Sequence, residues 1–173
     1  MSLVGRQAPT FELEGVHRGE FEKFRLEDYK GKWVVLFFYP LDFTFVCPTE
    51  LREFHQRREE FEKLGADLLA ASVDSKYTHL AWQKGELGEI SYPMLSDLTK
   101  SVARRYGVLL EDLGIALRGL FIIDPEGVVQ YEVVHGLDVG RSVDETLRVL
   151  QALQTGALCP VNWQPGEADL GKA

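Results

Sequence analysis

The chain has 173 residues, of which 45% are hydrophobic and 27% charged, so its composition fits one globular domain and excludes a disordered or collagen-like chain. Its 19 basic and 27 acidic residues give a net charge of −8, which argues against nucleic acid or an anionic membrane as a partner. The longest apolar run, Trp33–Tyr39, is far too short to span a bilayer. Because no apolar stretch of signal-peptide length follows Met1, the sequence predicts a cytoplasmic protein.

The predicted elements alternate between strands and helices. Residues 33–39 and 66–74 are apolar on both faces, as strands in the middle of a sheet are, and residues 48–64 between them have the apolar periodicity of a helix. A right-handed crossover makes these two strands parallel neighbours. The other predicted elements, in chain order, are an edge strand in 9–13 followed by turns at Gly15 and Gly19, helices at 76–84 and 99–106, a hairpin of 117–123 with 128–135, and a helix with a capping box at Ser142 and Glu145.

These elements predict an α/β fold, with a central mixed β-sheet covered by helices on both faces. Their order resembles a thioredoxin-like fold with an N-terminal extension. Residues 156–173 are rich in proline and glycine and predict an irregular C-terminal tail. We expect residues 1–173 to form a single domain that includes this tail.

Cys47 lies between the 33–39 strand and a predicted helix with Pro48 in its first turn. Ligands of open α/β sheets bind beyond the carboxyl ends of the strands, and a helix N-terminus carries unpaired N–H groups and a partial positive charge. A thiol in this position ionises more readily than a free thiol, and the thiolate is the nucleophile. An inert, apolar cysteine is the alternative.

Three familiar cysteine chemistries fit this sequence poorly. A dithiol motif needs a second cysteine three positions from Cys47, where Thr44 and Glu50 stand. A phosphatase loop needs an arginine six positions after the cysteine, where the chain has Glu53. A cysteine protease needs a histidine partner, and the histidines lie in no recognisable signature and are interpreted as surface or packing residues: His17, His55, His79 and His135. No metal-ligand cluster is seen, and neither a metal nor an organic cofactor is expected.

Two segments carry a resemblance to a known family. The first, Pro40-Leu41-Asp42-Phe43-Thr44-Phe45-Val46-Cys47-Pro48, is similar to the active-site segment of the peroxiredoxins. The second, Gly156-Ala157-Leu158-Cys159-Pro160-Val161-Asn162-Trp163, resembles the resolving-cysteine segment of the typical two-cysteine subgroup, which includes the alkyl hydroperoxide reductase peroxidase subunit and the thiol-specific antioxidants. Residues 117–124 and 136–142 also resemble family segments, so the resemblance covers nearly the whole chain.

The resemblance implies a thiol peroxidase that reduces hydrogen peroxide and organic hydroperoxides without a cofactor. Cys47 resembles the peroxidatic cysteine, which becomes a sulfenic acid. Cys159 resembles the resolving cysteine, which attacks this sulfenic acid on the partner subunit and forms an intersubunit disulfide. Thioredoxin or a flavoprotein disulfide reductase then recycles the disulfide.

The resemblance also implies roles for five further residues. Thr44 would hold the peroxide beside the sulfur, and Pro40 would shield the pocket. Arg118 would bring a fixed positive charge to the thiolate, although a charge on an otherwise apolar strand also fits a solvent-facing edge position. Glu50 and Arg141 would orient Arg118, and a plain surface ion pair is their alternative.

Two features of assembly follow from the same resemblance. The family implies a homodimer, and residues 77–82 resemble the segment through which such dimers meet in decameric rings, although an apolar core helix is the alternative for this segment. Two other functions remain open at this point. One is a holdase chaperone built from the same rings, and the other is a thioredoxin-fold adaptor whose cysteines are inert.

Overall fold

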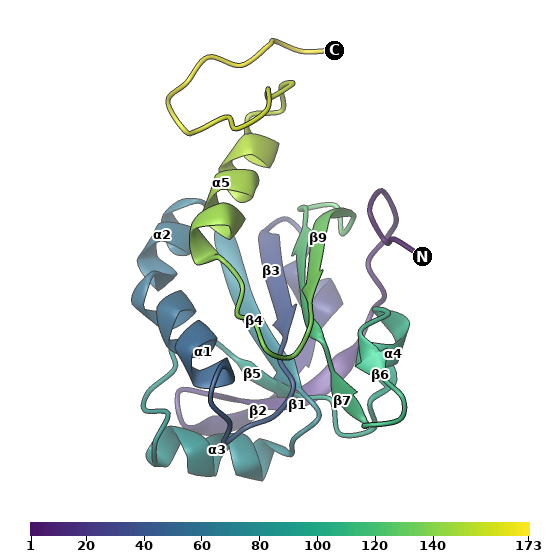
Figure 1. Ribbon diagram of the computed structural model, residues 1–173, viewed down its shortest axis with the longest axis vertical. Coiled ribbons are helices and arrows are strands. Elements are labelled where there is room, and N and C mark those ends of the chain that lie inside the picture. Colours follow the sequence, from purple (N-terminus) through teal and green to yellow (C-terminus); the bar gives the residue numbers. More distant parts are fainter. The chain divides into compact units, whose positions relative to one another are not determined.

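The computed structural model describes residues 1–173, which form two compact units, residues 1–141 and residues 142–173. The first unit contains a seven-stranded sheet in the order β2-β1-β5-β4-β3-β8-β9 (Figure 1). Its strands are β1 (Glu12–His17), β2 (Glu20–Arg25), β3 (Trp33–Phe38), β4 (Ala66–Ser72), β5 (Met94–Ser96), β8 (Arg118–Ile123) and β9 (Val129–His135). A separate ribbon pairs β6 (Leu109–Leu110) with β7 (Ile115–Ala116). The helices of this unit are α1 (Cys47–Gln56), α2 (Arg58–Lys63), α3 (Lys76–Lys84) and α4 (Ser101–Arg105), with a 3-10 turn at Leu26–Tyr29.

The sheet is mixed, as predicted. β3 is parallel to β4 and β4 is parallel to β5, whereas every other pairing in the sheet is antiparallel. Trp33 lies opposite Ala66 and Phe38 lies opposite Ala71, so the two strands predicted as parallel neighbours are confirmed in that arrangement. Both are buried on the two faces of the sheet, which explains their continuous apolar sequences.

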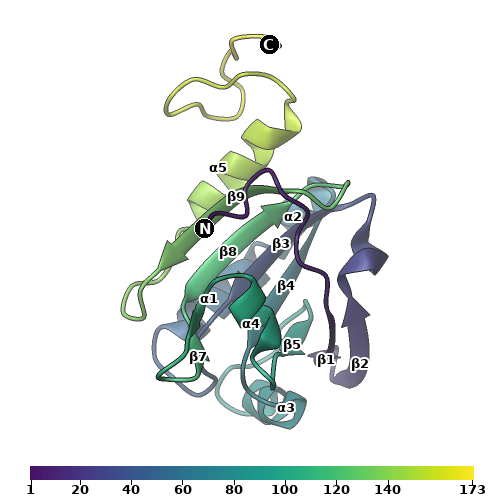
Figure 2. The same cartoon turned by 90° about the vertical axis from the view of Figure 1, so that its right-hand side faces the viewer.

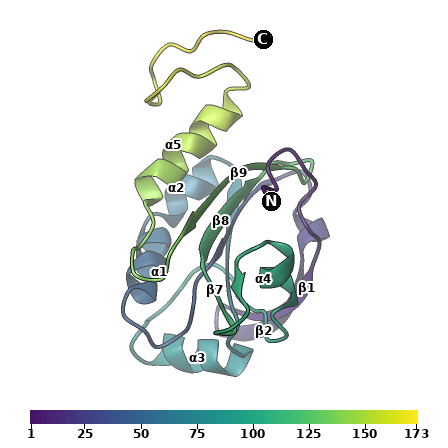
Figure 3. The ribbon, with the colours of Figure 1, turned by 45° about the vertical axis from the view of Figure 1, so that its right-hand side comes forward.

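Helices cover both faces of the sheet (Figure 3). Phe37 of β3 stacks on Phe54 of α1 with ring centroids 4.3 Å apart, so α1 and α2 lie on that face. The neighbouring residue Phe38 points to the opposite face, where its ring lies 5.5 Å from that of Tyr106, just beyond α4. α3 lies at one end of the sheet against β1 and β5 (Figure 2). None of the helices has both the length and the apolar character that crossing a membrane requires.

The predicted N-terminal edge strand is wrong. The strand starts later, at Glu12, and pairs with β2 on one side and β5 on the other, so it is an internal strand. Gly15 is not a turn but lies inside β1, where a Cβ atom would come 2.6 Å from the carbonyl oxygen of Met94. Only glycine allows the two backbones to approach this closely. Gly19, with φ +77°, is the turn between β1 and β2.

The predicted helix over 48–64 is two helices, which meet at Arg57 with φ −101° and ψ 14°. The apolar periodicity continues through this break, and neither glycine nor proline marks it, so the sequence pattern contained no sign of it. The first helix begins at Cys47, one residue before Pro48. The predicted helix at 99–106 is shorter, because Lys100 has a left-handed backbone (φ 66°) and α4 starts after it.

The predicted hairpin of 117–123 with 128–135 is confirmed, and residues 124–127 form the turn between its strands. The Gly127 N–H donates to the Asp124 carbonyl oxygen at 2.9 Å, and the Asp124 carboxylate accepts the N–H groups of Glu126 and Val128. This turn joins β8 to β9, and it thereby fixes the end of the strand that begins with Arg118.

The second unit contains one helix, α5 (Val143–Gln154), followed by residues without helix or strand, as predicted for the tail. The Ser142 side chain accepts the Glu145 N–H at 3.1 Å, which is one half of the predicted capping box. The other half is not formed, because the Glu145 carboxylate binds Arg148 instead, at 2.6 Å and 2.7 Å. The single domain expected over residues 1–173 stays a prediction.

Candidate active site

Cys47 is the first residue of α1 and follows the loop that leaves the carboxyl end of β3. Its side chain is a free thiol with only 1% of its surface exposed. No side chain caps the N-terminus of α1, so the positive end of the helix faces the region of the thiol. Cys47 therefore lies between a central strand and the start of a helix, as the sequence predicted, and its sulfur is also shielded from water.

Arg118 contacts this sulfur directly. It is the first residue of β8, it is 3% exposed, and its Nη1 donates to Cys47 Sγ at 3.2 Å. Its Nε and Nη2 both donate to the carbonyl oxygen of Leu137, at 3.0 Å and 2.7 Å. The solvent-facing alternative for Arg118 is thus wrong. A guanidinium held at two other points brings a fixed positive charge to the sulfur.

Glu50 and Arg141 hold Arg118 from the other side. Glu50 Oε1 accepts Arg118 Nη1 at 2.8 Å, and Glu50 Oε2 accepts both the side chain and the backbone N–H of Arg141, at 2.7 Å and 2.8 Å. All three side chains are at most 4% exposed, so the alternative of a plain surface ion pair is also wrong. Two cations and one anion leave one net positive charge beside Cys47, which a thiolate would neutralise.

The charge of Glu50 is stabilised by its partners. Burial alone would raise its pKa, but the hydrogen bonds and charge of Arg141, together with the charge of Arg118, outweigh burial and hold the pKa of Glu50 below its ordinary value. Glu50 therefore stays ionised and keeps both arginines in place.

This lowered pKa predicts how stability depends on pH. We expect the contribution of Glu50 to the free energy of unfolding to be complete above about pH 4.3, the ordinary glutamate value, and to be lost as the pH falls through the lower folded value. Urea unfolding between about pH 5 and about pH 3 should therefore show a shallower loss of stability for Glu50→Gln than for the wild type. Glu53→Gln, which changes an exposed carboxylate of the same helix, is the matched control. An equally steep loss in Glu50→Gln and the wild type would contradict this assignment.

The loop before Cys47 contains the two other predicted residues of this segment. Pro40 is buried at its start, and the half-buried Thr44 donates its hydroxyl to the Leu41 carbonyl oxygen at 2.8 Å. Phe43 between them has a left-handed backbone with φ +59°. Thr44 thus uses its proton within the loop, while the lone pairs of its hydroxyl oxygen remain available to a ligand.

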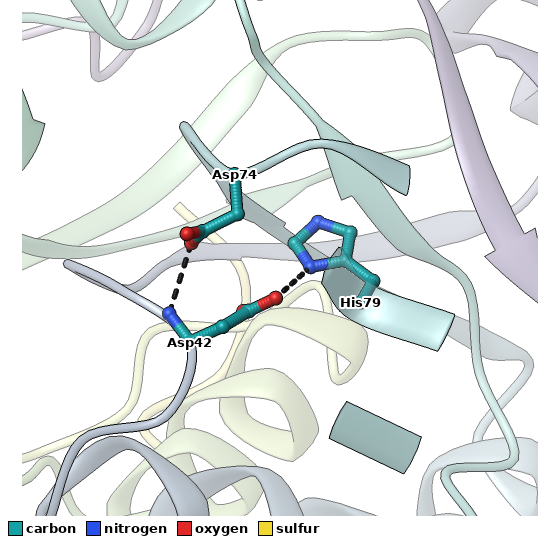
Figure 4. A group of neighbouring side chains, drawn as sticks. All are labelled: Asp42, Asp74 and His79. Carbon is teal, nitrogen blue, oxygen red and sulfur yellow. Dashed lines mark hydrogen bonds and ion pairs between the residues drawn. The ribbon is translucent and has the colours of Figure 1, made fainter. Parts of the chain in front are cut away.

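A buried polar cluster that sequence reasoning missed anchors the same loop (Figure 4). His79 Nδ1 lies 2.6 Å from Asp42 Oδ2, and the Asp42 N–H donates to Asp74 Oδ2 at 2.9 Å. His79 Nε2 lies 2.9 Å from the Leu95 carbonyl oxygen, which only accepts, so Nε2 carries a proton and a further proton lies between Nδ1 and Asp42. Burial raises the pKa of Asp42 and outweighs the opposing effect of His79.

The ligand atoms of this cluster lie within 4.8 Å of one another, as metal ligands do. They are, however, already bonded within the protein: Asp74 Oδ2 also accepts the Ser72 hydroxyl at 2.6 Å, and Asp42 Oδ1 accepts the Tyr39 hydroxyl at 2.6 Å. The cluster therefore fastens the loop to α3 and β5. The signal in the sequence was the pair of polar residues Asp42 and His79 inside quoted motif segments.

Cys159 belongs to the second unit and is also a free, half-buried thiol. Its Sγ lies 3.5 Å from Thr155 Oγ1 and 3.7 Å from the Ala152 carbonyl oxygen, at the end of α5. Thr155 donates its own hydroxyl to Ala152 and accepts the Ala157 N–H, so acceptor atoms surround the Cys159 S–H.

The chain is similar to known proteins over most of its length. Residues 4–132 match the AhpC/TSA family. The 2-Cys peroxiredoxin BAS1 of the chloroplast of Spinacia oleracea is 56% identical, over 98% of this chain and 68% of its own length. Peroxiredoxin-2 of Mus musculus is 53% identical, over 94% of this chain and 87% of its own length. The reduced 2-Cys peroxiredoxin of Plasmodium vivax superposes with a TM-score of 0.94 at 44% identity, covering 97% of this chain and 92% of that one.

These similarities extend over nearly the whole chain, so they concern the fold as well as the cysteine segments. They confirm the thioredoxin-like fold that the order of elements predicted. Peroxiredoxins use a cysteine thiol to reduce peroxide, form a sulfenic acid and then a disulfide, and depend on a thioredoxin-type reductant. The chain therefore belongs to the AhpC/TSA family and is a two-cysteine peroxiredoxin, a thiol-dependent peroxidase.

Proposed function

We propose that Cys47 is the thiolate that attacks peroxide. Its sulfur takes one peroxide oxygen and becomes a sulfenic acid, the O–O bond breaks, and the other oxygen leaves with a proton as water or an alcohol. The observation that carries this assignment is the 3.2 Å contact from Arg118 Nη1 to the buried Cys47 Sγ, within a cluster that has one net positive charge. The same guanidinium stabilises the negative charge that develops on the leaving oxygen.

The neighbouring residues serve this step in different ways. Thr44 holds the peroxide through its hydroxyl, and the buried Pro40 shields the pocket from water. Glu50 and Arg141 act through Arg118, because their contacts fix the direction of its guanidinium rather than touch the sulfur. The substrates that we propose are hydrogen peroxide and organic hydroperoxides.

Cys159 of a second copy resolves the sulfenic acid. Its thiol attacks Cys47, an intersubunit disulfide forms, and the hydroxyl of the sulfenic acid leaves as water. Thioredoxin or a flavoprotein disulfide reductase then supplies two electrons and two protons and restores both thiols. Since this cycle starts from two free thiols, it suits a reducing compartment, and we place the protein in the cytoplasm.

The functional unit in this proposal is a homodimer that assembles into a decameric ring through the segment 77–82. Within that segment His79 and Trp82 are buried, whereas Tyr77 is 66% exposed and available to a partner. Phe43 and Phe45 of the active-site loop are also exposed, at 52% and 93%. Exposed aromatic side chains of this kind are typical of surfaces that bind another protein.

A non-reducing gel tests the resolving step. After one equivalent of hydrogen peroxide, we expect a species of twice the chain mass in the wild type. Cys159→Ser should lose this species and yet consume its first equivalent of peroxide at the wild-type rate, because Cys47 and its contacts are intact. A monomer that has lost both thiols would contradict the intersubunit disulfide.

A further inference from the structure

Two buried arginines share one carboxylate beside Cys47. Arg141 Nε and Nη2 donate to the two carboxylate oxygens of Glu50, at 2.7 Å and 3.0 Å, although Oε1 of the same carboxylate also accepts Arg118 Nη1. The third nitrogen atom, Arg141 Nη1, donates at 2.8 Å to the carbonyl oxygen of Gly119, which directly follows Arg118 in β8. Arg141 thus joins the carboxylate and the strand that position Arg118, but its own buried charge is balanced only in part.

An aromatic ring supplies a further contact to this charge. The central guanidinium carbon of Arg141, Cζ, lies over the Phe37 ring, 5.3 Å from its centroid. Phe37 is fully buried and the Arg141 side chain is 2% exposed, so water screens the contact little. The face of an aromatic ring is electronegative and attracts a cation within about 6 Å, and the attraction is largest where both partners are desolvated. The Phe37 ring therefore offsets part of the positive charge that Glu50 leaves unbalanced.

The Phe37 ring is held in place by its own neighbours. It stacks on the Phe54 ring of α1, with centroids 4.3 Å apart and an interplanar angle of 20°. The Tyr92 ring packs against it at 5.8 Å, and the Tyr92 hydroxyl donates to the Leu51 carbonyl oxygen at 2.6 Å. These contacts hold the ring between β3 and α1, so that its face stays directed at Arg141.

We propose that Phe37, besides filling the core, is a positioning residue for the reaction with peroxide. Its ring holds the Arg141 guanidinium, which in turn keeps Glu50 in place. Glu50 then directs the Arg118 donor, which lies 3.2 Å from Cys47 Sγ. A weaker hold on Arg141 lets this donor move away from the reacting atoms, and a misplacement of about 1 Å slows an enzymatic step by up to about 10²-fold. The inference rests on the proposed attack of Cys47 on peroxide.

The test replaces Phe37 with mono-, di- and trifluorinated phenylalanine on a Cys159→Ser background. Fluorine draws electron density from the ring face and weakens its attraction for a cation stepwise, while the ring keeps nearly the same shape and the fold is retained. We expect the second-order rate constant for hydrogen peroxide under single-turnover conditions to fall with each added fluorine, by about tenfold for the trifluorinated ring. A ring that only fills the core would leave this rate constant unchanged across the series.

Phe38 is the matched control, because it is the next residue of β3, is equally buried and packs against Tyr106 on the opposite face of the sheet. Fluorination of Phe38 should leave the rate constant at the value of the unmodified ring. Fluorination of Phe37 should likewise have no effect in Arg141→Met, in which the ring faces no arginine. A constant rate in the Phe37 series, or an equal fall in the Phe38 series or in Arg141→Met, would overturn the role of Phe37 while rapid reaction of the unmodified protein still supports the proposed function. If Cys47 of the unmodified protein reacts with peroxide no faster than a free thiol does, both are overturned.

Discussion

We expect Cys47→Ser to abolish peroxide reduction. The serine hydroxyl is not ionised at neutral pH, even beside Arg118, so no nucleophile of comparable strength remains in the pocket. Stopped-flow decay of hydrogen peroxide in the presence of a thiol reductant should fall to the uncatalysed rate, a loss of more than about 10³-fold. Because serine is close to cysteine in size, the fold and the thermal unfolding should change little.

Cys159→Ser is the control for this variant, measured with protein in excess over peroxide. It should keep the fast first turnover, so that only Cys47 accounts for the reaction with peroxide. Residual peroxide reduction by Cys47→Ser at the wild-type rate would contradict the assignment. The same variant separates the other functions that the sequence left open, since a holdase or an adaptor with inert cysteines would keep its binding activity.

Arg118→Met should slow the reaction of Cys47 with peroxide by about 10²-fold to 10³-fold, the usual cost of removing one fixed donor from an active site. The variant removes the positive charge 3.2 Å from the sulfur, and the remaining Glu50 and Arg141 together carry no net charge. The measurement is the second-order rate constant for hydrogen peroxide under single-turnover conditions, on a Cys159→Ser background. Alkylation of Cys47 by iodoacetamide at neutral pH should slow as well, because the thiolate fraction falls.

Two further variants show whether charge or geometry matters in this prediction. Arg118→Lys keeps the charge but lacks the planar group that binds Leu137 and reaches the sulfur at the same time, so only part of the rate should return. Arg104→Met removes a surface arginine elsewhere and should react as the wild type does. A rate within about twofold of the wild type in Arg118→Met would contradict the role of its charge.

The sequence predicted those helices and strands whose formation depends mainly on residues close to one another in the chain. The helix at 76–84 and the strands β3 and β4 were predicted from their apolar patterns, because the spacing of apolar residues along the chain shows which faces of a helix or strand are buried. Cys47 was identified in the same way, from its position between a strand and a helix start. The break at Arg57 and the internal position of β1 were missed, since both depend on what packs against the segment and not on its own pattern.

The site required the tertiary structure. Glu50 lies 68 positions from Arg118 and 91 positions from Arg141 in the sequence, and only the resemblance to a family connected them before the strand order brought them together. The Leu137 carbonyl group that holds Arg118 left no pattern in the sequence. Asp42 and His79 stood out only as polar residues inside motif segments, and the sequence did not show that they contact each other. The type of each residue can be read in the sequence, whereas the path of the backbone between two residues decides whether their side chains contact each other. The sequence by itself therefore predicted which thiol reacts, and the fold decided which charges surround it.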